Sequence, residues 1–155
     1  MRRVLILISV AAVAMACAKK ETPAADTAVA MAPAAPAAAP ALTEADVAGT
    51  WKGTSTPMGS DSVISRWTQV CGAGTCKGTI EGGKVVYVAT YTLAADSMTG
   101  VSQPFADPGL KGAKVIDNWV AHFSGANTTG TGAEKLASKP DSIVMAYRFT
   151  GSRVR

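Results

Sequence analysis

The clearest hydrophobic pattern in the chain is an alternation of apolar residues with a period of two. It runs through residues 85–93, 119–123 and 143–149. The side chains predicted to share a face in each segment are Val85, Tyr87, Ala89, Tyr91 and Leu93; Trp119, Ala121 and Phe123; and Ile143, Met145, Tyr147 and Phe149. Such alternation is typical of β-strands with one buried face, and after Gly49 no long segment shows the helical period of 3.6. The pattern predicts an all-β domain.

Turn signals between these segments favour an antiparallel meander. The Gly-Gly pair at 82–83 stands between two short apolar segments and suits a two-residue hairpin turn. Asp-Ser pairs begin at Asp61, Asp96 and Asp141, each followed by an apolar residue. Because Asp and Ser side chains bond to nearby backbone, each pair is predicted to form a turn that leads into a strand.

The N-terminus has a different pattern, an unbroken apolar run at residues 4–16 behind Arg2 and Arg3. The run is about 13 residues, which suits the core of a signal peptide and falls short of the roughly 20 that a spanning helix needs. The two arginines would hold the start of the chain on the cytoplasmic side of a membrane. Residues 1–16 are therefore predicted to be a signal peptide.

The residues that follow the apolar run are Ala14-Met15-Ala16-Cys17, which resemble the lipobox of bacterial lipoproteins. The resemblance implies that Cys17 carries acyl chains such as palmitate and becomes the mature N-terminus, as a membrane anchor. The family usually has Leu where Ala14 stands, and the same residues fit the A-x-A rule of ordinary secretory cleavage, so both remain open. With Ala18 after the cysteine, the resemblance favours the outer membrane of a bacterial cell envelope, facing the periplasm.

The chain has three cysteines: Cys17, Cys71 and Cys76. If Cys17 carries lipid, the other two can pair and no thiol is left over. Cysteines that face each other across a narrow antiparallel pair have a Cα separation that a disulfide can bridge. Gly72 and Gly74 are expected to allow the tight return between them. A metal or redox site is disfavoured, because the spacing is not C-x-x-C and no second Cys/His cluster accompanies it.

Composition separates residues 17–42 from residues 43–155. In residues 21–42, 15 of the 22 positions are Ala or Pro. Proline interrupts helices, and no apolar periodicity persists, so residues 17–42 are predicted to be a lipidated cysteine followed by a disordered tether. Thr43 and Asp46 have the spacing of a capped helical turn and mark the start of a single folded domain.

The start of this domain, Gly49-Thr50-Trp51, resembles the G-x-W motif of lipocalin-like (calycin) barrels. In those families a basic residue near the end of the last strand packs over the tryptophan, and Arg153 and Arg155 stand at a suitable place. The resemblance implies a barrel closed at one end by Trp51, with an apolar interior. The other lipocalin motifs are missing, and the domain is short, which favours a smaller or partly open barrel over a full eight-stranded cup.

Charge and the missing motifs narrow the class of function. The formal charge of +4 falls to about +2 without Arg2 and Arg3, and no basic patch alternates with aromatics, which argues against nucleic acid. His122 is the only histidine, and alternation places it on the face opposite Trp119 and Asp117. No nucleophile, P-loop or dinucleotide motif occurs, and residues 129–132 are predicted to be a flexible loop. We predict no catalysis, no cofactor and no metal.

These observations favour a non-catalytic binding module. It would hold a small apolar ligand inside the barrel or an envelope partner at its loops, with residues 105–112 predicted as a long exposed loop. The residues expected to line a ligand or close the barrel are Trp51, Trp67, Trp119 and Arg153. A purely structural or protein-interaction lipoprotein is the first alternative, and a hydrolase that uses His122 is the second.

Overall fold

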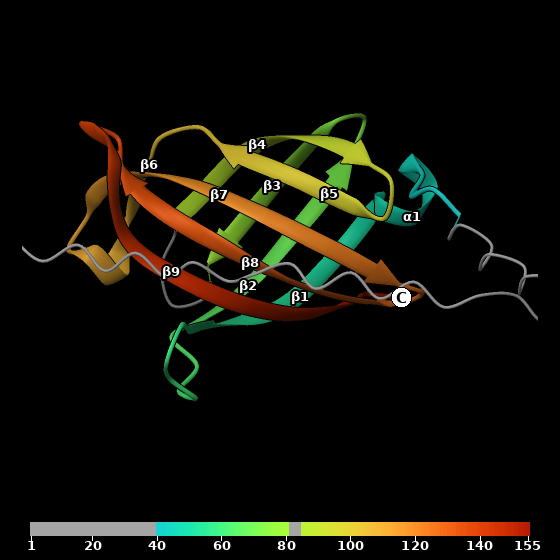
Figure 1. Cartoon of the computed structure of the whole chain (residues 1–155), viewed down its shortest axis with the longest axis horizontal. Coiled ribbons are helices and arrows are strands. Elements are labelled where there is room, and N and C mark those ends of the chain that lie inside the picture. The colour runs from blue at the N-terminus through green and yellow to red at the C-terminus, as the bar shows by residue number, and fades with distance from the viewer. Residues whose placement is uncertain (1–39, 81–84) are drawn as a thin grey trace, which may run out of the picture. The chain divides into compact units, whose positions relative to one another are not determined.

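The computed structural model describes residues 40–80 and 85–155, which form one β-barrel (Figure 1). The strands are β1 (Gly49–Pro57), β2 (Ser65–Gly72), β3 (Thr75–Ile80), β4 (Val85–Ala94), β5 (Ser97–Ser102), β6 (Phe105–Asp107), β7 (Ala113–Ser124), β8 (Asn127–Leu136) and β9 (Lys139–Arg153). A short helix, α1 (Glu44–Val47), precedes them, and a 3-10 turn, η1 (Pro108–Leu110), follows β6. The predicted all-β class is confirmed. The predicted signal peptide, Cys17 and most of the tether lie outside the described residues.

Neighbouring strands pair antiparallel, and the sheet closes on itself. Pairing follows chain order from β1 to β5 and from β7 to β9, and the pairs β1–β9 and β5–β7 complete the ring. After Gln103 and Pro104, β6 continues the line of β5 along β7, so the ring has eight strand positions. The antiparallel barrel is thus confirmed in its closed form, and the preference for a smaller or partly open one is wrong. Four hairpins turn within two residues, which leaves most of the short domain for strands.

Burial follows the predicted alternation on most strands. The buried side chains with that pattern are Ala89, Tyr91, Trp119, Ala121, Tyr147 and Phe149. Among the predicted residues whose burial is described, Ile143 departs from the pattern, since it is 59% exposed. Its strand carries two register shifts against β8, where Glu134 pairs with Met145 but Lys135 pairs with Ile143. A bulge of this kind inserts one extra residue into the strand. The alternation of inward and outward side chains is therefore shifted by one residue beyond the bulge, and Ile143 points outward.

Two of the three Asp-Ser pairs lie at turns that lead into strands. Asp61 precedes β2, and Asp96 completes the turn before β5. The third prediction is wrong, because Asp141 lies inside β9 and the turn falls at residues 137–138. The Gly-Gly pair at 82–83 lies outside the described residues, although β3 and β4 pair antiparallel on either side of it.

Large rings inside the barrel lie over glycines of the neighbouring strand. The opposed pairs are Gly53 and Trp67, Gly78 and Tyr87, Gly100 and Trp119, Gly130 and Phe149, and Gly132 and Tyr147. A Cβ on any of these glycines would come within 2.0–2.4 Å of a ring atom. Glycine inside a strand can mark such a close approach. The prediction of a flexible loop at residues 129–132 is therefore wrong, because its two glycines belong to β8.

The predicted exposed loop at residues 105–112 is also partly wrong. Its first three residues form β6, in which Phe105 and Asp107 are buried at 8% and 5% exposure. The Asp107 carboxylate then accepts a hydrogen bond from the Gly109 N–H at 2.5 Å and caps η1. Ala106 and the residues after Asp107 lie at the surface, whereas Phe105 and Asp107 contribute to the barrel interior.

The domain begins with the predicted capped turn. Both the N–H and the hydroxyl of Thr43 donate to Asp46, at 2.9 and 2.6 Å. One residue earlier, the Leu42 N–H donates to the Ala95 carbonyl at 2.6 Å, and Leu42 packs against the core. Over the described ranges, no helix is both long enough and apolar enough to cross a membrane.

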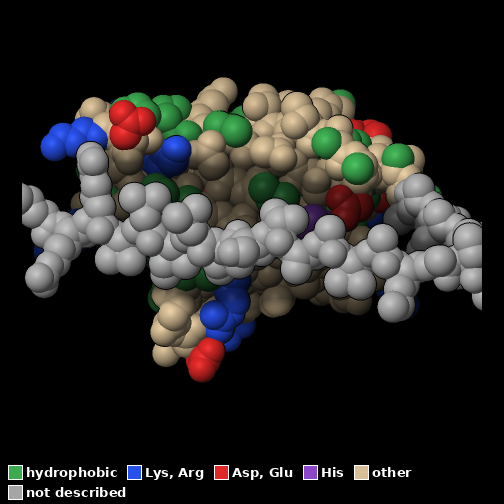
Figure 2. Space-filling view, viewed as in Figure 1, with side chains coloured by type: hydrophobic (Ala, Val, Ile, Leu, Met, Phe, Trp, Pro, Cys, Tyr) green, Lys and Arg blue, Asp and Glu red, His purple; other side chains and the backbone are tan. Residues whose placement is uncertain are grey.

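The outer surface carries apolar side chains spread among polar atoms. Those along the upper edge of Figure 2 lie over β4 and β5, where Val86, Val88 and Val101 are 38–49% exposed. Single exposed apolar side chains are ordinary on protein surfaces.

Candidate functional site

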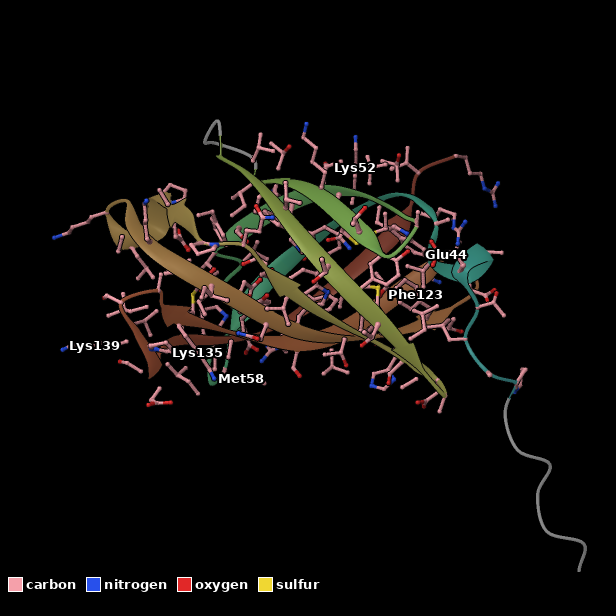
Figure 3. The ribbon with its side chains drawn as sticks, turned by 90° about the horizontal axis from the view of Figure 1, so that it is seen from above. Glu44, Lys52, Met58, Phe123, Lys135 and Lys139 are labelled. Carbon is pink, nitrogen blue, oxygen red and sulfur yellow. A yellow bond between two sulfur atoms is a disulfide. The ribbon has the colours of Figure 1, made fainter. Side chains whose placement is uncertain are left out.

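The barrel interior has two halves of different composition. Figure 3 shows Glu44 and Phe123 at the end next to α1, and Met58, Lys135 and Lys139 at the opposite end. We call the part near α1 the closed half; its fully buried side chains are Val47, Trp51, Cys76, Ala89 and Met98. We call the rest the cavity half, because an internal cavity lies there.

Trp51 and Arg153 close the first of these halves. The Trp51 indole N–H donates to the Val47 carbonyl at 2.8 Å, and the ring is fully buried. The Arg153 guanidinium lies 4.8 Å from the Trp51 ring centroid and donates to the Ala48 carbonyl at 2.9 Å and to the Asp46 carbonyl. A cation is stabilised both over an indole face and beside the carbonyls that end a helix. This geometry agrees with the barrel that the G-x-W resemblance implies.

Cys71 and Cys76 face each other on β2 and β3 and form the predicted disulfide, with Cα atoms 4.1 Å apart. The prediction is therefore confirmed. Positive φ angles fall on Ala73 and Gly74, whereas Gly72 keeps ordinary strand geometry. The closed loop is short, so the bond is expected to stabilise the fold by about 2 kcal/mol.

The cavity has a volume of about 60 Å³ within which the centre of a water molecule can lie. That is room for roughly four or five waters, or for an organic molecule of similar size. Thirteen described residues line it: Ser55, Ser65, Trp67, Gln69, Ile80, Tyr87, Phe105, Asp117, Trp119, Glu134, Met145, Tyr147 and Phe149. Six of these are aromatic, and two are acids. The cavity is therefore small, aromatic and polar at once.

Hydrogen bonds order part of the polar lining. The Tyr147 hydroxyl donates to one oxygen of Asp117 at 2.7 Å, and the Tyr87 hydroxyl donates to Gln69 at 3.1 Å. The other Asp117 oxygen and Glu134 Oε2 are buried without a hydrogen-bond partner. Buried polar atoms are normally paired, so two unpaired acid oxygens at one cavity mark it as a candidate site.

Burial raises the pKa of both acids, Asp117 and Glu134. Burial raises the pKa of Glu134 to about 9, helped by a side-chain hydrogen bond with Asp107 and by the negative charges of Asp107 and Asp117. Burial likewise raises the pKa of Asp117 to about 7, although the hydrogen bond from Tyr147 opposes the shift. Near neutral pH, Glu134 is therefore expected to be protonated, and Asp117 holds its proton to a higher pH than an exposed aspartate does. Groups with such shifts are concentrated at functional sites.

The residues predicted as ligand-lining separate into two groups. Trp67 and Trp119 line the cavity, whereas Trp51 and Arg153 belong to the closed half. Cys17 lies outside the described residues. His122 is on the outer face, with its side chain 54% exposed and 3.8 Å from Asp96, so the structure does not bring it near the cavity. Within residues 40–80 and 85–155, no three His, Cys, Asp or Glu side chains are grouped so that they could hold a metal ion.

No family model, curated protein or solved structure matches this chain. The cavity is therefore the feature of this chain that bears most directly on its function.

Sequence reasoning missed the polar members of this site. Alternation had placed Asp117 on the inner face with Trp119, and a charged residue on an apolar face is a signal that could have found it. Glu134 gave no such signal, because residues just before it were interpreted as a loop. Tyr87 and Tyr147 were assigned to the inner face as core, with no role for their hydroxyl groups.

Proposed function

We propose that this chain is a non-catalytic binding protein of the bacterial envelope, whose barrel holds a small ligand in its interior cavity. The observation that carries the proposal is the difference between the two halves. The closed half is filled with side chains, and the cavity half keeps space beside buried polar groups. Ligand sites in small barrels are typically such interior spaces, apolar in the main with a few polar groups that fix orientation.

The size and lining of the cavity restrict the ligand. A volume of about 60 Å³ suits a compact molecule rather than a long acyl chain. The aromatic rings favour contacts with the carbon atoms of a ligand, in agreement with the apolar ligand expected from the sequence. Asp117 and Glu134 indicate that the ligand should also carry a polar group, because their free oxygens would otherwise stay unpaired or be solvated by water alone.

The envelope location rests on the N-terminal residues. The disulfide between Cys71 and Cys76 supports it indirectly, since it leaves Cys17 as the cysteine available for acylation. Two or more acyl chains would give stable anchoring. An envelope partner is the second candidate, although exposed valines such as Val86, Val88 and Val101 are ordinary on a protein surface and do not by themselves favour it.

A native mass spectrum of the full protein from its own cell envelope tests these points together. We expect acyl chains on Cys17, a deficit of two hydrogens for the disulfide, and a non-covalent adduct that denaturation removes. The Ser55→Leu variant, which places a larger side chain at the cavity wall, should lose the adduct. Thr54→Leu, on the outward face of the same strand, is the matched control and should keep it. A wild-type spectrum without any adduct would overturn the small-ligand function.

A further inference from the structure

Two acid side chains stand directly opposite each other inside the barrel. Asp117 of β7 and Glu134 of β8 are register partners, and both line the cavity. Opposed residues on antiparallel strands have Cβ atoms about 5 Å apart, and like charges at such positions destabilise a sheet. Something positive must therefore offset this pair whenever both acids are ionised.

The free oxygens of the pair indicate where that positive group would lie. Glu134 is only 5% exposed, yet its Oε2 has no hydrogen-bond partner, and neither has Asp117 Oδ1. The second Asp117 oxygen already accepts from the Tyr147 hydroxyl. Asp117 Oδ1 thus offers an acceptor to a donor on a ligand, and Glu134 offers one once it gives up the proton of its hydrogen bond with Asp107. A buried acceptor left unpaired costs free energy.

The rest of the lining also favours positive charge. Of the described residues that line the cavity, none is Lys or Arg. Aromatic rings, including Trp67, Trp119 and Tyr87, make up much of the wall, and ring faces attract cations. The wall offers carbon contacts as well, and the described residues contain no cluster of three metal-binding side chains. An organic cation matches this lining better than a metal ion.

We propose that the cavity binds a small organic ammonium ion, whose nitrogen donates to Asp117 and Glu134 while its carbon atoms pack among Trp67 and Trp119. This inference rests on the proposed binding function and names the chemical class of its ligand. The cavity volume suits a ligand of about five heavy atoms, the size of a butylammonium ion.

Protons compete with the ligand for the same oxygens. Glu134 and Asp117 have raised pKa values, while burial keeps Tyr87 and Tyr147 protonated by raising theirs further. Among the described residues, the further acid that acts on the pair is Asp107 of β6, which helps to hold the proton on Glu134. Binding of an ammonium ion should release protons, so its affinity must rise with pH between about 6 and 9.

The test compares three probes of similar size, n-butylammonium, 1-butanol and butyrate, on the full-length protein in detergent. The indole N–H signals of Trp67 and Trp119 in proton–nitrogen correlation spectra report binding at the cavity. At pH 8 we expect butylammonium to bind at least tenfold more tightly than 1-butanol, and its affinity to fall several-fold at pH 6. Glu134→Gln and Asp117→Asn should each weaken butylammonium about tenfold and leave 1-butanol unchanged. Asp141→Asn, an exposed acid on β9, is the control and should change neither.

Each failure has a separate meaning. If 1-butanol or butyrate binds as tightly as butylammonium, the ammonium inference is overturned while the small-ligand function stands. If calcium chloride saturates the same signals at a tenfold lower concentration, the site belongs to a metal ion and the inference is again overturned. If no probe shifts the indole signals and the native spectrum shows no adduct, both the inference and the proposed function fail.

Discussion

The closed half and the cavity half belong to the same barrel, but they differ in packing and in the pairing of their polar groups. In the closed half, Trp51 and Met98 have no exposed surface, and Arg153 satisfies the carbonyls that end α1. In the cavity half, one side-chain oxygen each of Asp117 and Glu134 is buried without a hydrogen-bond donor, beside open space. Complete packing stabilises a fold, whereas space and unpaired polar groups lower its stability. The comparison indicates that the closed half supports the fold, whereas the cavity half gives up stability for the space and the polar groups on which the proposed ligand site rests.

Removal of a tryptophan from each half should give the largest contrast. Trp51→Ala is expected to lower the free energy of unfolding by about 3–5 kcal/mol, because it opens a new hole in a filled region. Trp119→Ala is expected to cost roughly half as much, because one side of its ring already borders the cavity. Urea unfolding followed by circular dichroism measures both. Equal losses would contradict the distinction between the two halves.

The buried acids should make stability depend on pH. The pKa of Glu134 is raised to about 9, so the folded protein keeps a proton that the unfolded chain has lost above about pH 4. Stability conferred by that proton is lost as pH rises, with a slope of up to about 1.4 kcal/mol per unit. Between pH 5 and pH 7 the wild type should therefore lose about 2–3 kcal/mol more than Glu134→Gln.

Chemical unfolding of the two proteins at pH 5, 6 and 7 measures this difference. Asp141→Asn should keep the wild-type slope, because Asp141 is exposed. Parallel profiles for the wild type and Glu134→Gln would mean that Glu134 is solvated in the folded protein, and the cavity half would then lack its buried acid.

The sequence predicted the closed half better than the cavity half, for physical reasons. Trp51, Arg153 and the two cysteines of the disulfide carry signals that are local or tied to a motif, and they were found. The cavity depends on strand register, which pairs Asp117 with Glu134 across β7 and β8. That register was hidden because Gly130 and Gly132 resemble loop residues until a ring is seen to lie over each. The cavity volume depends on side chains from many strands together, so no local sequence signal predicts it.

A methyl group on one such glycine tests whether the rings need that space. Gly132→Ala would place its Cβ 2.4 Å from the Tyr147 ring, and it should destabilise the fold by about 1–3 kcal/mol through overpacking. Because Tyr147 donates to Asp117, the variant should also shift the pH dependence of the cavity half. Gly72→Ala is the matched control, since nothing lies within 4 Å of its Cβ and its φ is not positive. A similar loss in both variants, measured by thermal unfolding, would refute the packing role.

The smallest effect is expected from a conservative change in the closed half. Arg153→Lys keeps the positive charge but loses the planar group that stacks on Trp51 and reaches several carbonyls at once. We expect a loss of about 1 kcal/mol, the size of one cation–π contact or one hydrogen bond. Arg155→Lys, at the exposed C-terminal residue, should have no measurable effect. Binding in the cavity should be the same for Arg153→Lys and the wild type once both are folded, because Arg153 does not line it. A change in ligand affinity without a change in stability would show that the two halves are coupled, and the closed half would then also shape the site.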